Sequence, residues 1–453
     1  MIHRYEMNGY HIVLDVNSGA VHVVDKLIYD MLGLVCPPFS SEELEKTVES
    51  LDGEYPREEI CEAYDELKEL YDAGQLFTED DYAQYAGKMV ASPVKALCLH
   101  VAHDCNLRCE YCFASTGDFG GGRSIMPLET GKKAIDFLIR SSVGRRNLEV
   151  DFFGGEPLMN WQMVKDTVLY AREQEKLHNK NFRFTVTTNG MLLDDEKIDF
   201  INKEMSNVVL SIDGRKEVND RVRARVDGSG CYDAIMPKFV ELVKRRGDGQ
   251  YYVRGTFTKY NLDFAEDVLH LNDLGFDQIS VEPVVSAPGL PYTLEESDLP
   301  AIYAEYERLA KTMIRRKKEG RGFNFFHFML DLDQGPCAIK RLRGCGCGNE
   351  YVAITPDGDI YPCHQFVGQE QWKMGNLYDD TFNFAMKADF AASNVYTKED
   401  CKNCWAKFYC SGGCNANSAT YCGDIHKPYK ISCDLEKKRL ECAIMIKAAM
   451  AEE

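Results

Sequence analysis

The sequence of 453 residues lacks the long hydrophobic runs that carry a chain across a membrane. No stretch approaches the roughly 18 consecutive apolar residues of a membrane-spanning helix. The first residues, MIHRYEMNGYH, also lack the basic start and apolar centre of a secretory signal peptide. We therefore expect a cytoplasmic protein without a membrane partner.

Positive charge is also scarce. The chain has 53 basic and 72 acidic residues, which gives a formal net charge of −19. Proteins that bind nucleic acid need a basic surface to neutralise phosphates, so we expect no nucleic-acid partner. The hydrophobic fraction of 45% is ordinary for a globular protein and ample for several cores.

Cysteine, in contrast, is abundant, with 18 residues. Because no export signal is present, the expected compartment is reducing, and disulfides are disfavoured there. Cysteines grouped at short spacings in such a compartment more often bind metal. Five cysteines stand apart from the groups and are interpreted as buried or free thiols: Cys36, Cys61, Cys98, Cys231 and Cys442.

Residues 1–85 are predicted to form a small α+β domain. Two alternating runs, Tyr10–Asp15 and Ala20–Asp25, flank Asn17-Ser18-Gly19, whose residues tolerate positive φ, so a hairpin is expected. Helical patterns follow at Lys26–Leu34, Glu42–Leu51 and Arg57–Ala73.

Residues 86–322 alternate β-rich runs with helical patterns. The expected strands are Ala96–Ala102, Leu148–Phe153, Phe182–Thr188, Val208–Ile212, Tyr251–Phe257 and Gln278–Glu282. The expected helices between them are Leu128–Ser141, Met163–Leu177, Asp195–Glu204, Tyr232–Arg245 and Leu262–Asp273. This alternation predicts parallel strands with right-handed crossovers, hence an α/β fold. Six units predict an open, partial (β/α)6 barrel, with functional residues at the C-terminal ends of its strands.

Residues 323–453 are predicted to form a third domain. Between Cys337 and Cys433 the chain is dense in cysteine and poor in long periodic segments, which is typical of a fold built around metal. Two long helices border this region, one expected at Glu295–Lys318 in the preceding connector and one at Leu435–Met450.

The first predicted barrel strand leads into three cysteines spaced C-x3-C-x2-C, namely Cys105, Cys109 and Cys112. Three thiolates can hold three irons of a [4Fe–4S] cube and leave the fourth iron open. An open iron can bind the amino and carboxylate groups of S-adenosylmethionine, whose reductive cleavage releases a 5′-deoxyadenosyl radical. A zinc knuckle and a closed cluster are the alternatives.

Polar residues follow the next three strands. Gly154 and Gly155 would let a backbone edge approach a ligand, and Glu156 could accept a hydrogen bond from an ammonium group. Further polar side chains at strand ends suit a ribose or a carboxylate: Asn189, Ser211, Asp213 and, just beyond, Arg223. For any one of them, ordinary turn chemistry is the alternative.

A second dense group of cysteines lies near the C-terminus. Its spacing is C-x2-C-x5-C-x3-C over Cys401, Cys404, Cys410 and Cys414, followed by Cys422 and Cys433. Upstream, the turn Pro356-Asp357-Gly358 would bring Cys345 and Cys363 together. These thiols suffice for two further four-cysteine clusters, with structural zinc as the alternative.

With these motifs, residues 95–433 resemble the radical S-adenosylmethionine (SAM) enzymes that carry a SPASM extension. The resemblance implies SAM and three [4Fe–4S] clusters as cofactors, with Cys105, Cys109 and Cys112 at the catalytic cluster. It implies cofactor contacts by Tyr111, Gly154, Gly155, Glu156, Asn189, Ser211, Asp213 and Arg223. It assigns Cys345, Cys363 and Cys414 to a first auxiliary cluster and Cys401, Cys404, Cys410 and Cys433 to a second.

The resemblance leaves the fourth ligand of the first auxiliary cluster open. Cys337 is one candidate, since relatives that oxidise sulfatases supply an additional upstream cysteine. Cys347, at a position where many relatives have alanine, is a competing ligand. Without either of them, the open iron could bind a thiolate of the substrate.

Residues 1–85 resemble the winged-helix-like α+β peptide-recognition domain of peptide maturases, which holds a leader peptide as an added strand. The whole chain most closely resembles the maturases of six-cysteine (SCIFF) peptides, which form Cys-to-Thr thioether links. This implies two partners, a cysteine-rich precursor peptide with a leader and an electron donor such as flavodoxin or ferredoxin. Rival functions are formylglycine formation in sulfatases, epimerisation or carbon–carbon crosslinking of peptides, and a non-catalytic iron–sulfur carrier or scaffold.

Overall fold

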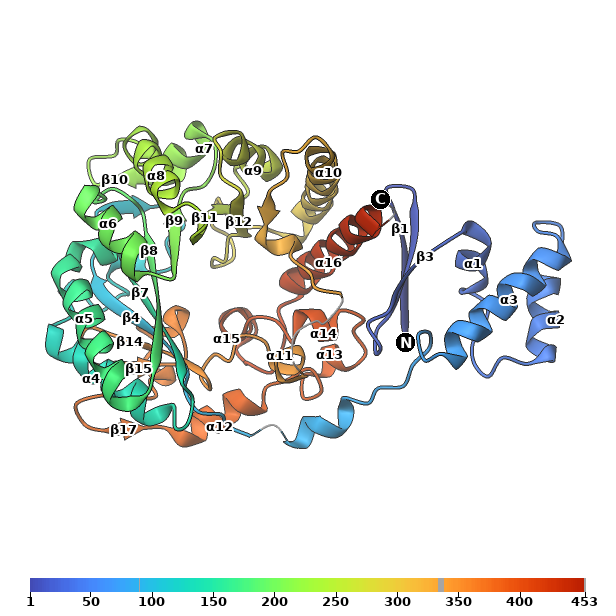
Figure 1. Cartoon of the computed structure of the whole chain (residues 1–453), viewed down its shortest axis with the longest axis horizontal. Helices are drawn as coiled ribbons and strands as arrows, with labels where there is room; N and C mark the ends of the chain where they lie inside the picture. Colours follow the sequence, from blue (N-terminus) through green and yellow to red (C-terminus); the bar gives the residue numbers. More distant parts are fainter. Residues whose placement is uncertain (89, 333–337, 452–453) are drawn as a thin grey trace.

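The computed structural model describes residues 1–88, 90–332 and 338–451. Figure 1 shows a barrel-like α/β region, a small sheet with helices at the opposite end, and a cysteine-rich region between them. Among the described residues, none of the helices is both long and apolar enough to cross a bilayer.

The barrel contains six consecutive parallel neighbours, in the order β12-β11-β9-β8-β7-β4. All eight residues of β4 are buried, as expected for a parallel strand covered on both faces. The predicted partial (β/α)6 barrel is thus confirmed. The strands are β4 (Ala96–His103), β7 (Asn147–Gly154), β8 (Asn181–Thr188), β9 (Asn207–Ser211), β11 (Gln250–Phe257) and β12 (Gln278–Pro283).

Helices follow these strands and cover the outside of the sheet (Figure 1). They are α4 (Leu128–Ser141), α5 (Trp161–His178), α6 (Asp195–Glu204), α7 (Lys216–Val222), α8 (Tyr232–Arg246), α9 (Phe264–Asp273) and α10 (Leu299–Lys318). The sequence did not predict α7, a short helix of two turns. Short strands complete the region: β5 (Leu107–Cys109), β6 (Ser124–Ile125), β10 (Arg223–Arg225) and β13 (Asn324–Phe325).

The cysteine-rich region extends the barrel sheet. Strand β14 (Tyr351–Ile354) pairs in parallel with β4, and β15 (Asp359–Tyr361) returns beside it after the predicted turn at Pro356-Asp357-Gly358. Two more strands continue this edge, β16 (Gly375–Asn376) and β17 (Thr381–Phe382). The remaining helices are α11 (Ala338–Arg343), α12 (Phe384–Ala392), α13 (Glu399–Lys402), α14 (Lys407–Cys410), α15 (Asn415–Cys422) and α16 (Lys430–Ala451).

The N-terminal region has three antiparallel strands where the sequence predicted two. Strands β1 (Ile2–Met7), β2 (Tyr10–Asp15) and β3 (Val21–Val24) lie in this order, followed by α1 (Lys26–Met31), α2 (Ser41–Ser50) and α3 (Arg57–Asp72). Asn8 and Gly9, with φ of 55° and 84°, join β1 to β2 in a tight turn. An Asn-Gly pair is a strong hairpin signal, so β1 was detectable from the sequence.

The sheet of the N-terminal region docks on the C-terminal helix. Figure 1 shows β1 beside α16, and the Tyr5 hydroxyl donates a hydrogen bond to the Glu441 carbonyl at 2.8 Å. The His3 ring stacks on the Trp405 ring with centroids 3.8 Å apart. Trp405 follows Cys404 directly, so the N-terminal sheet rests against a cysteine-bearing segment.

Candidate active site and metal centres

The loop after β4 gathers the three cysteines of the C-x3-C-x2-C motif. Cys112 acts electrostatically on the thiols of both Cys105 and Cys109, so the three thiols lie close to one another. Burial raises the pKa of Cys105 to about 11 and that of Cys109 to about 12. Such thiols ionise at neutral pH only with a cationic partner, and the irons of a cluster are one.

The glycines after β7 fit against this loop. A Cβ on Gly154 would lie 2.3 Å from the Ala102 carbonyl oxygen, and one on Gly155 would lie 2.1 Å from the Asp104 carbonyl oxygen. The Gly155 and Glu156 amides donate to these same two carbonyls at 2.8 and 2.9 Å. The absence of side chains at these glycines therefore allows their backbone to approach the backbone just before Cys105.

Glu156 is fully buried, and protein groups donate to its carboxylate. The hydrogen bonds come from the Leu158 amide at 3.0 Å, the Thr188 hydroxyl at 2.7 Å and the Asn189 amide at 2.8 Å. Burial outweighs these hydrogen bonds and raises the pKa of Glu156 to about 7. The Asn189 side chain in turn donates to Asn106 at 2.8 Å, inside the cysteine loop.

A second buried network holds the other half of the loop. Asp213 accepts the Tyr111 hydroxyl at 2.7 and 2.9 Å and the Arg223 guanidinium at 2.9 and 3.1 Å. The Thr256 amide also donates to Asp213, at 2.9 Å. Strand β10, which starts at Arg223, pairs with β5, which ends at Cys109. The expected carboxylate partner of Arg223 is therefore Asp213.

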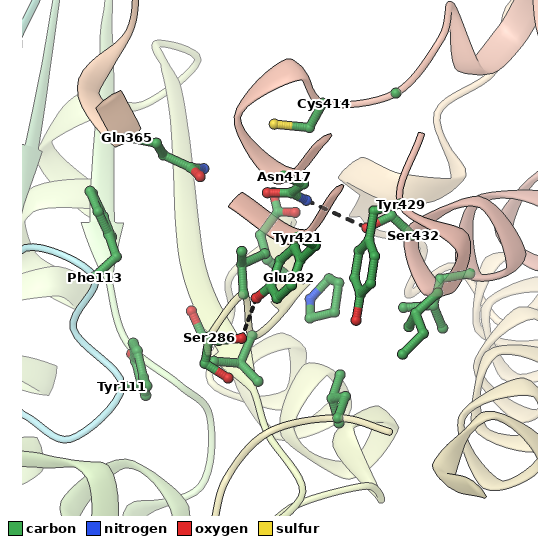
Figure 2. Close-up of a pocket in the computed structure, with 18 of the residues that line it drawn as sticks. Tyr111, Phe113, Glu282, Ser286, Gln365, Cys414, Asn417, Tyr421, Tyr429 and Ser432 are labelled. Carbon is green, nitrogen blue, oxygen red and sulfur yellow. Dashed lines mark hydrogen bonds between the residues drawn. The ribbon is translucent and has the colours of Figure 1, made fainter. Parts of the chain in front are cut away.

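One cavity of about 550 Å³ lies between the barrel and the cysteine-rich region. Among the described residues, its barrel wall includes Tyr111, Ser211 and Arg223, and its other wall includes Cys414. Figure 2 shows Tyr111 and Cys414 on different sides of this space. Five other predicted cofactor contacts are not part of this lining, and their hydrogen bonds connect them to the cysteine loop or to its neighbours: Gly154, Gly155, Glu156, Asn189 and Asp213.

The first auxiliary set of cysteines assembles with an additional member. Cys345, Cys363 and Cys414 influence one another electrostatically, so the three predicted ligands lie together. Cys347 belongs to the same group, because its thiol contacts Cys363. Cys345 and Cys414 also act on this thiol electrostatically. The other candidate for the fourth ligand, Cys337, lies outside the described residues.

The second auxiliary set assembles from the segment 401–410 and the start of α16. Cys433, Cys401 and Cys404 all act electrostatically on the Cys410 thiol, so the four predicted ligands lie in one group. Burial raises the pKa of Cys433 to about 11, and it raises the pKa of Cys410 further.

The cysteine geometry agrees with the iron–sulfur alternative. Within the described part of the chain, no three His, Cys, Asp or Glu side chains converge tightly enough to hold a single metal ion, as structural zinc requires. In a [4Fe–4S] cube each thiolate binds a different iron, so its ligands stand farther apart. One group of three thiols and two groups of four thiols suit clusters of this kind.

Comparison with known proteins agrees with this geometry. Residues 99–247 match the Radical SAM superfamily, and residues 345–405 match the iron-sulfur cluster-binding domain SPASM. The chain carries a radical SAM domain and a SPASM domain. The prediction of a radical SAM enzyme is confirmed, and the cofactors of these domains are SAM and [4Fe–4S] clusters.

Similar proteins are found among enzymes with these domains. A cysteine-type anaerobic sulfatase-maturating enzyme of Clostridium novyi is 24% identical over 69% of this chain and 86% of its own length. The structure of anSMEcpe with bound AdoMet and Kp18Cys peptide has a TM-score of 0.65 and 19% identity, and covers 79% of this chain and 100% of its own. Streptococcus suis SuiB bound to precursor peptide SuiA has a TM-score of 0.52 and 17% identity, and covers 95% of this chain and 98% of its own.

Sequence reasoning missed a charged group at the radical SAM cavity. Glu282, at the end of β12, accepts the Arg254 guanidinium at 3.1 Å. Behind it, Arg439 donates to His327 at 2.8 Å, and the His327 ring lies 3.6 Å from Glu282. Glu282, Arg254 and Arg439 all line the cavity. Their positions at a strand end and within a long helix give the sequence no short motif by which to find them.

Proposed function

We propose that the protein is a radical SAM maturase that installs Cys-to-Thr thioether crosslinks in a ribosomally made, cysteine-rich peptide. One observation carries the proposal: a single cavity is bordered by the cysteine loop of the radical SAM domain and by Cys414 of the SPASM domain. A peptide in this cavity meets both the site of radical formation and an auxiliary cluster. Holding the two reacting side chains together in this way selects the carbon that reacts.

The residues of the site fall into three groups, which would bind the cluster, contact the cofactor and hold the cysteine loop. Cys105, Cys109 and Cys112 would hold the cluster that binds SAM, and Tyr111, Ser211 and Arg223 would face the cofactor. When bound, this cluster and SAM supply the 5′-deoxyadenosyl radical that removes a hydrogen atom from the peptide. The networks of Glu156 and Asp213 keep the cysteine loop in place. An electron donor of the flavodoxin or ferredoxin class would reduce the cluster.

The first auxiliary set has two candidates for its fourth position, Cys347 and a peptide thiolate. Because Cys347 already contacts Cys363, it competes with the peptide. We expect a Cys347→Ala variant to bind a cysteine-containing peptide more tightly than the wild type, with a larger change in the electron paramagnetic resonance (EPR) signal of the reduced auxiliary clusters. A peptide with serine in place of cysteine is the control. Equal responses of both enzymes would exclude the competition.

The N-terminal region supports recognition of a leader. Strand β3 pairs with β2 on one side only within the described residues, and Val23 on it is 44% exposed. An edge strand with free backbone groups can take up an extended peptide as a further strand. SuiB, which covers 95% of this chain, was solved with a precursor peptide bound. The leader would therefore pair along β3.

Mass spectrometry of the peptide tests the proposal directly. A candidate cysteine-rich peptide is incubated anaerobically with reconstituted enzyme, SAM and a reductant. Each thioether should lower its mass by about 2 Da and remove one alkylatable thiol, because the reaction removes two hydrogens. A Cys105→Ala enzyme should leave the peptide unchanged. Abundant 5′-deoxyadenosine beside an unmodified peptide would exclude this substrate class.

A pair of surface variants tests the role of the leader. Val23→Asp should weaken binding of a labelled leader peptide at least about tenfold, because it places a charge at the pairing edge. Val143→Asp, at a site 73% exposed in the barrel region, is the matched control and should bind as the wild type does. Equal affinities of both variants would move the leader away from β3.

Formylglycine formation is the second candidate, favoured by the sulfatase-maturating relative. It differs in its product, because the modified cysteine loses its sulfur and gains an aldehyde. A thioether retains the sulfur and gives no aldehyde. Trapping with a hydrazide reagent therefore separates the two functions in the same incubation.

A further inference from the structure

A lysine is buried inside the SPASM domain. Lys398 is 1% exposed, and its ammonium donates to the Gly412 carbonyl at 2.7 Å and to the Asn415 side-chain oxygen at 3.0 Å. Ser411, Gly412 and Gly413 all have left-handed φ, of 58°, 86° and 73°, in the bend around this ammonium. The lysine is therefore anchored on the segment that joins Cys410 to Cys414.

That segment connects the two auxiliary sets, since Cys410 belongs to the second set and Cys414 to the first. The Lys398 ammonium lies close enough to thiols of both to be influenced by them. These thiols are Cys401, Cys410 and Cys433 of the second set and Cys414 of the first. Its charge also acts on Cys345 of the first set. The lysine thus stands between the two groups of proposed cluster ligands.

Lys398 makes no ion pair with a carboxylate among the described residues. The neighbouring Lys407, also buried, pairs with Asp80 at 2.7 Å. A buried ammonium without a counter-charge is costly, so a position such as that of Lys398 needs an anion nearby. Cysteine-ligated [4Fe–4S] clusters bring negative charge to both of its sides, because every ligand is a thiolate.

We propose that the Lys398 ammonium is the shared counter-charge of both auxiliary clusters and raises their reduction potentials. The net charge around a cluster is one of the factors that set its potential, and a fixed cation favours the reduced, more negative state. Burial from solvent, with no carboxylate partner in the described part of the chain, leaves this cation poorly screened. The inference rests on the proposed ligand sets and deepens the proposed function.

The potential matters for the last step of thioether formation. When a peptide thiolate bonds to a carbon radical, the new sulfur–carbon bond leaves one electron in excess. An auxiliary cluster held by Cys345, Cys363 and Cys414 would supply an acceptor for this electron, and an oxidised carrier of the flavodoxin or ferredoxin class would remove it afterwards. Lys398 makes uptake more favourable and, since it lies between both clusters, supports passage of the electron from one to the other.

An EPR-monitored redox titration tests the proposal. The background is the full chain with Cys105→Ala, Cys109→Ala and Cys112→Ala, so that only auxiliary clusters contribute. In this background, Lys398→Gln keeps a donor for Gly412 but removes the charge. Both midpoint potentials should shift to lower values. Unchanged potentials, or a shift of one cluster alone, would overturn the proposal.

Lys402→Gln is the matched control. Lys402 lies between Cys401 and Cys404 in the sequence, but its side chain is 44% exposed and pairs with Glu399 at 2.6 Å. Solvent and the carboxylate screen its charge, so its removal should leave both potentials unchanged. A shift as large as that of Lys398→Gln would show that any nearby charge acts in this way, which would contradict the proposal.

A second variant covers the case in which Lys398→Gln binds less iron than the wild type. If Lys398→Gln takes up less iron, Lys398→Arg, which keeps the charge, should restore iron content and potentials toward the wild type. An arginine variant that loads no better than the glutamine variant would contradict the proposal. These readouts need no peptide, so they stay valid whatever the substrate is.

Discussion

The barrel and the SPASM domain are stabilised by different interiors. Inside the barrel, aromatic side chains such as Phe152, Phe184 and Phe257 are completely buried, and long helices cover the sheet. Inside the SPASM domain, α13 and α14 have only four residues each, and Lys398 and Lys407 are buried beside cysteines. Apolar burial dominates the first region, whereas we expect the second to depend on bound metal as well.

Removal of iron should give the largest difference between the two regions. Chelation under reducing conditions takes away the bonds that hold segment 401–433 together. We expect its amides to exchange on the order of 100-fold faster, corresponding to about 3 kcal/mol of lost local stability. Amides of β4 and β7 should keep their protection, as followed by hydrogen exchange and mass spectrometry.

The variant Cys410→Ala should reproduce this loss of protection without a chelator, because it removes one ligand of the second set. Cys36→Ser, at an isolated exposed cysteine of the N-terminal region, is its control. Exchange that accelerates equally in barrel and SPASM domain after chelation would refute the difference in interiors.

Truncation of a side chain in the barrel core should have the opposite effect: it should destabilise the barrel and leave the SPASM domain unchanged. Phe184 is completely buried and stacks with Phe152 and Phe182 at centroid distances of 5.9 and 6.0 Å. Phe184→Ala should lower the free energy of barrel unfolding by about 3–5 kcal/mol, as large-to-small core changes do. Denaturant unfolding of the iron-loaded protein measures this loss, while iron content should stay unchanged. Loss of iron at equal barrel stability would contradict the expectation.

The barrel also contains a partly buried carboxyl that makes its stability depend on pH. Burial, helped by the charge of Glu149, raises the pKa of Asp151 from 3.8 to about 6. The folded state therefore holds this proton more tightly than the unfolded state, and the stabilisation is lost as the pH rises through 6. Asp151→Asn should be more stable than the wild type by about 3 kcal/mol at pH 8, and by little at pH 4.

Denaturant midpoints of both proteins at the two pH values measure the Asp151 effect. Asp248→Asn changes an exposed carboxyl and should show no such pH dependence. A stability difference for Asp151→Asn that is the same at pH 4 and pH 8 would contradict the prediction.

The smallest effect is expected where the N-terminal region meets the SPASM domain. His3→Ala removes the stack on Trp405 and the contact with Glu441, and should weaken docking by about 1 kcal/mol. Limited proteolysis of the segment after α3 should become a few times faster, with the barrel and iron content unaffected. His178→Ala, at the exposed end of α5, is the control. Unchanged proteolysis would place the docking energy elsewhere in the interface.

Strong periodic patterns made much of the fold predictable. All six barrel strands were predicted within about two residues, because buried parallel strands form continuous apolar runs between helical patterns. Strand β1 was missed because His3, Arg4 and Glu6 interrupt its apolar residues, although Asn8-Gly9 marked its end. The site was predictable where spacing carries the chemistry, as in the cysteine motifs. Lys398 and Glu282 were not, since a single lysine or glutamate has no signature until its neighbours are in place.

The sequence by itself determined the local chemistry: which cysteines lie close enough along the chain to share a cluster, and where strands deliver them. Only the tertiary structure decided how distant segments meet. Pairing of β14 with β4 joins the SPASM domain to the barrel sheet, and Cys414 lines the cavity of the radical SAM domain. Folding also turned Gly154 and Gly155 toward the backbone before Cys105 and placed Lys398 between the auxiliary sets. Such contacts arise from packing between residues far apart in the chain, which no local pattern encodes.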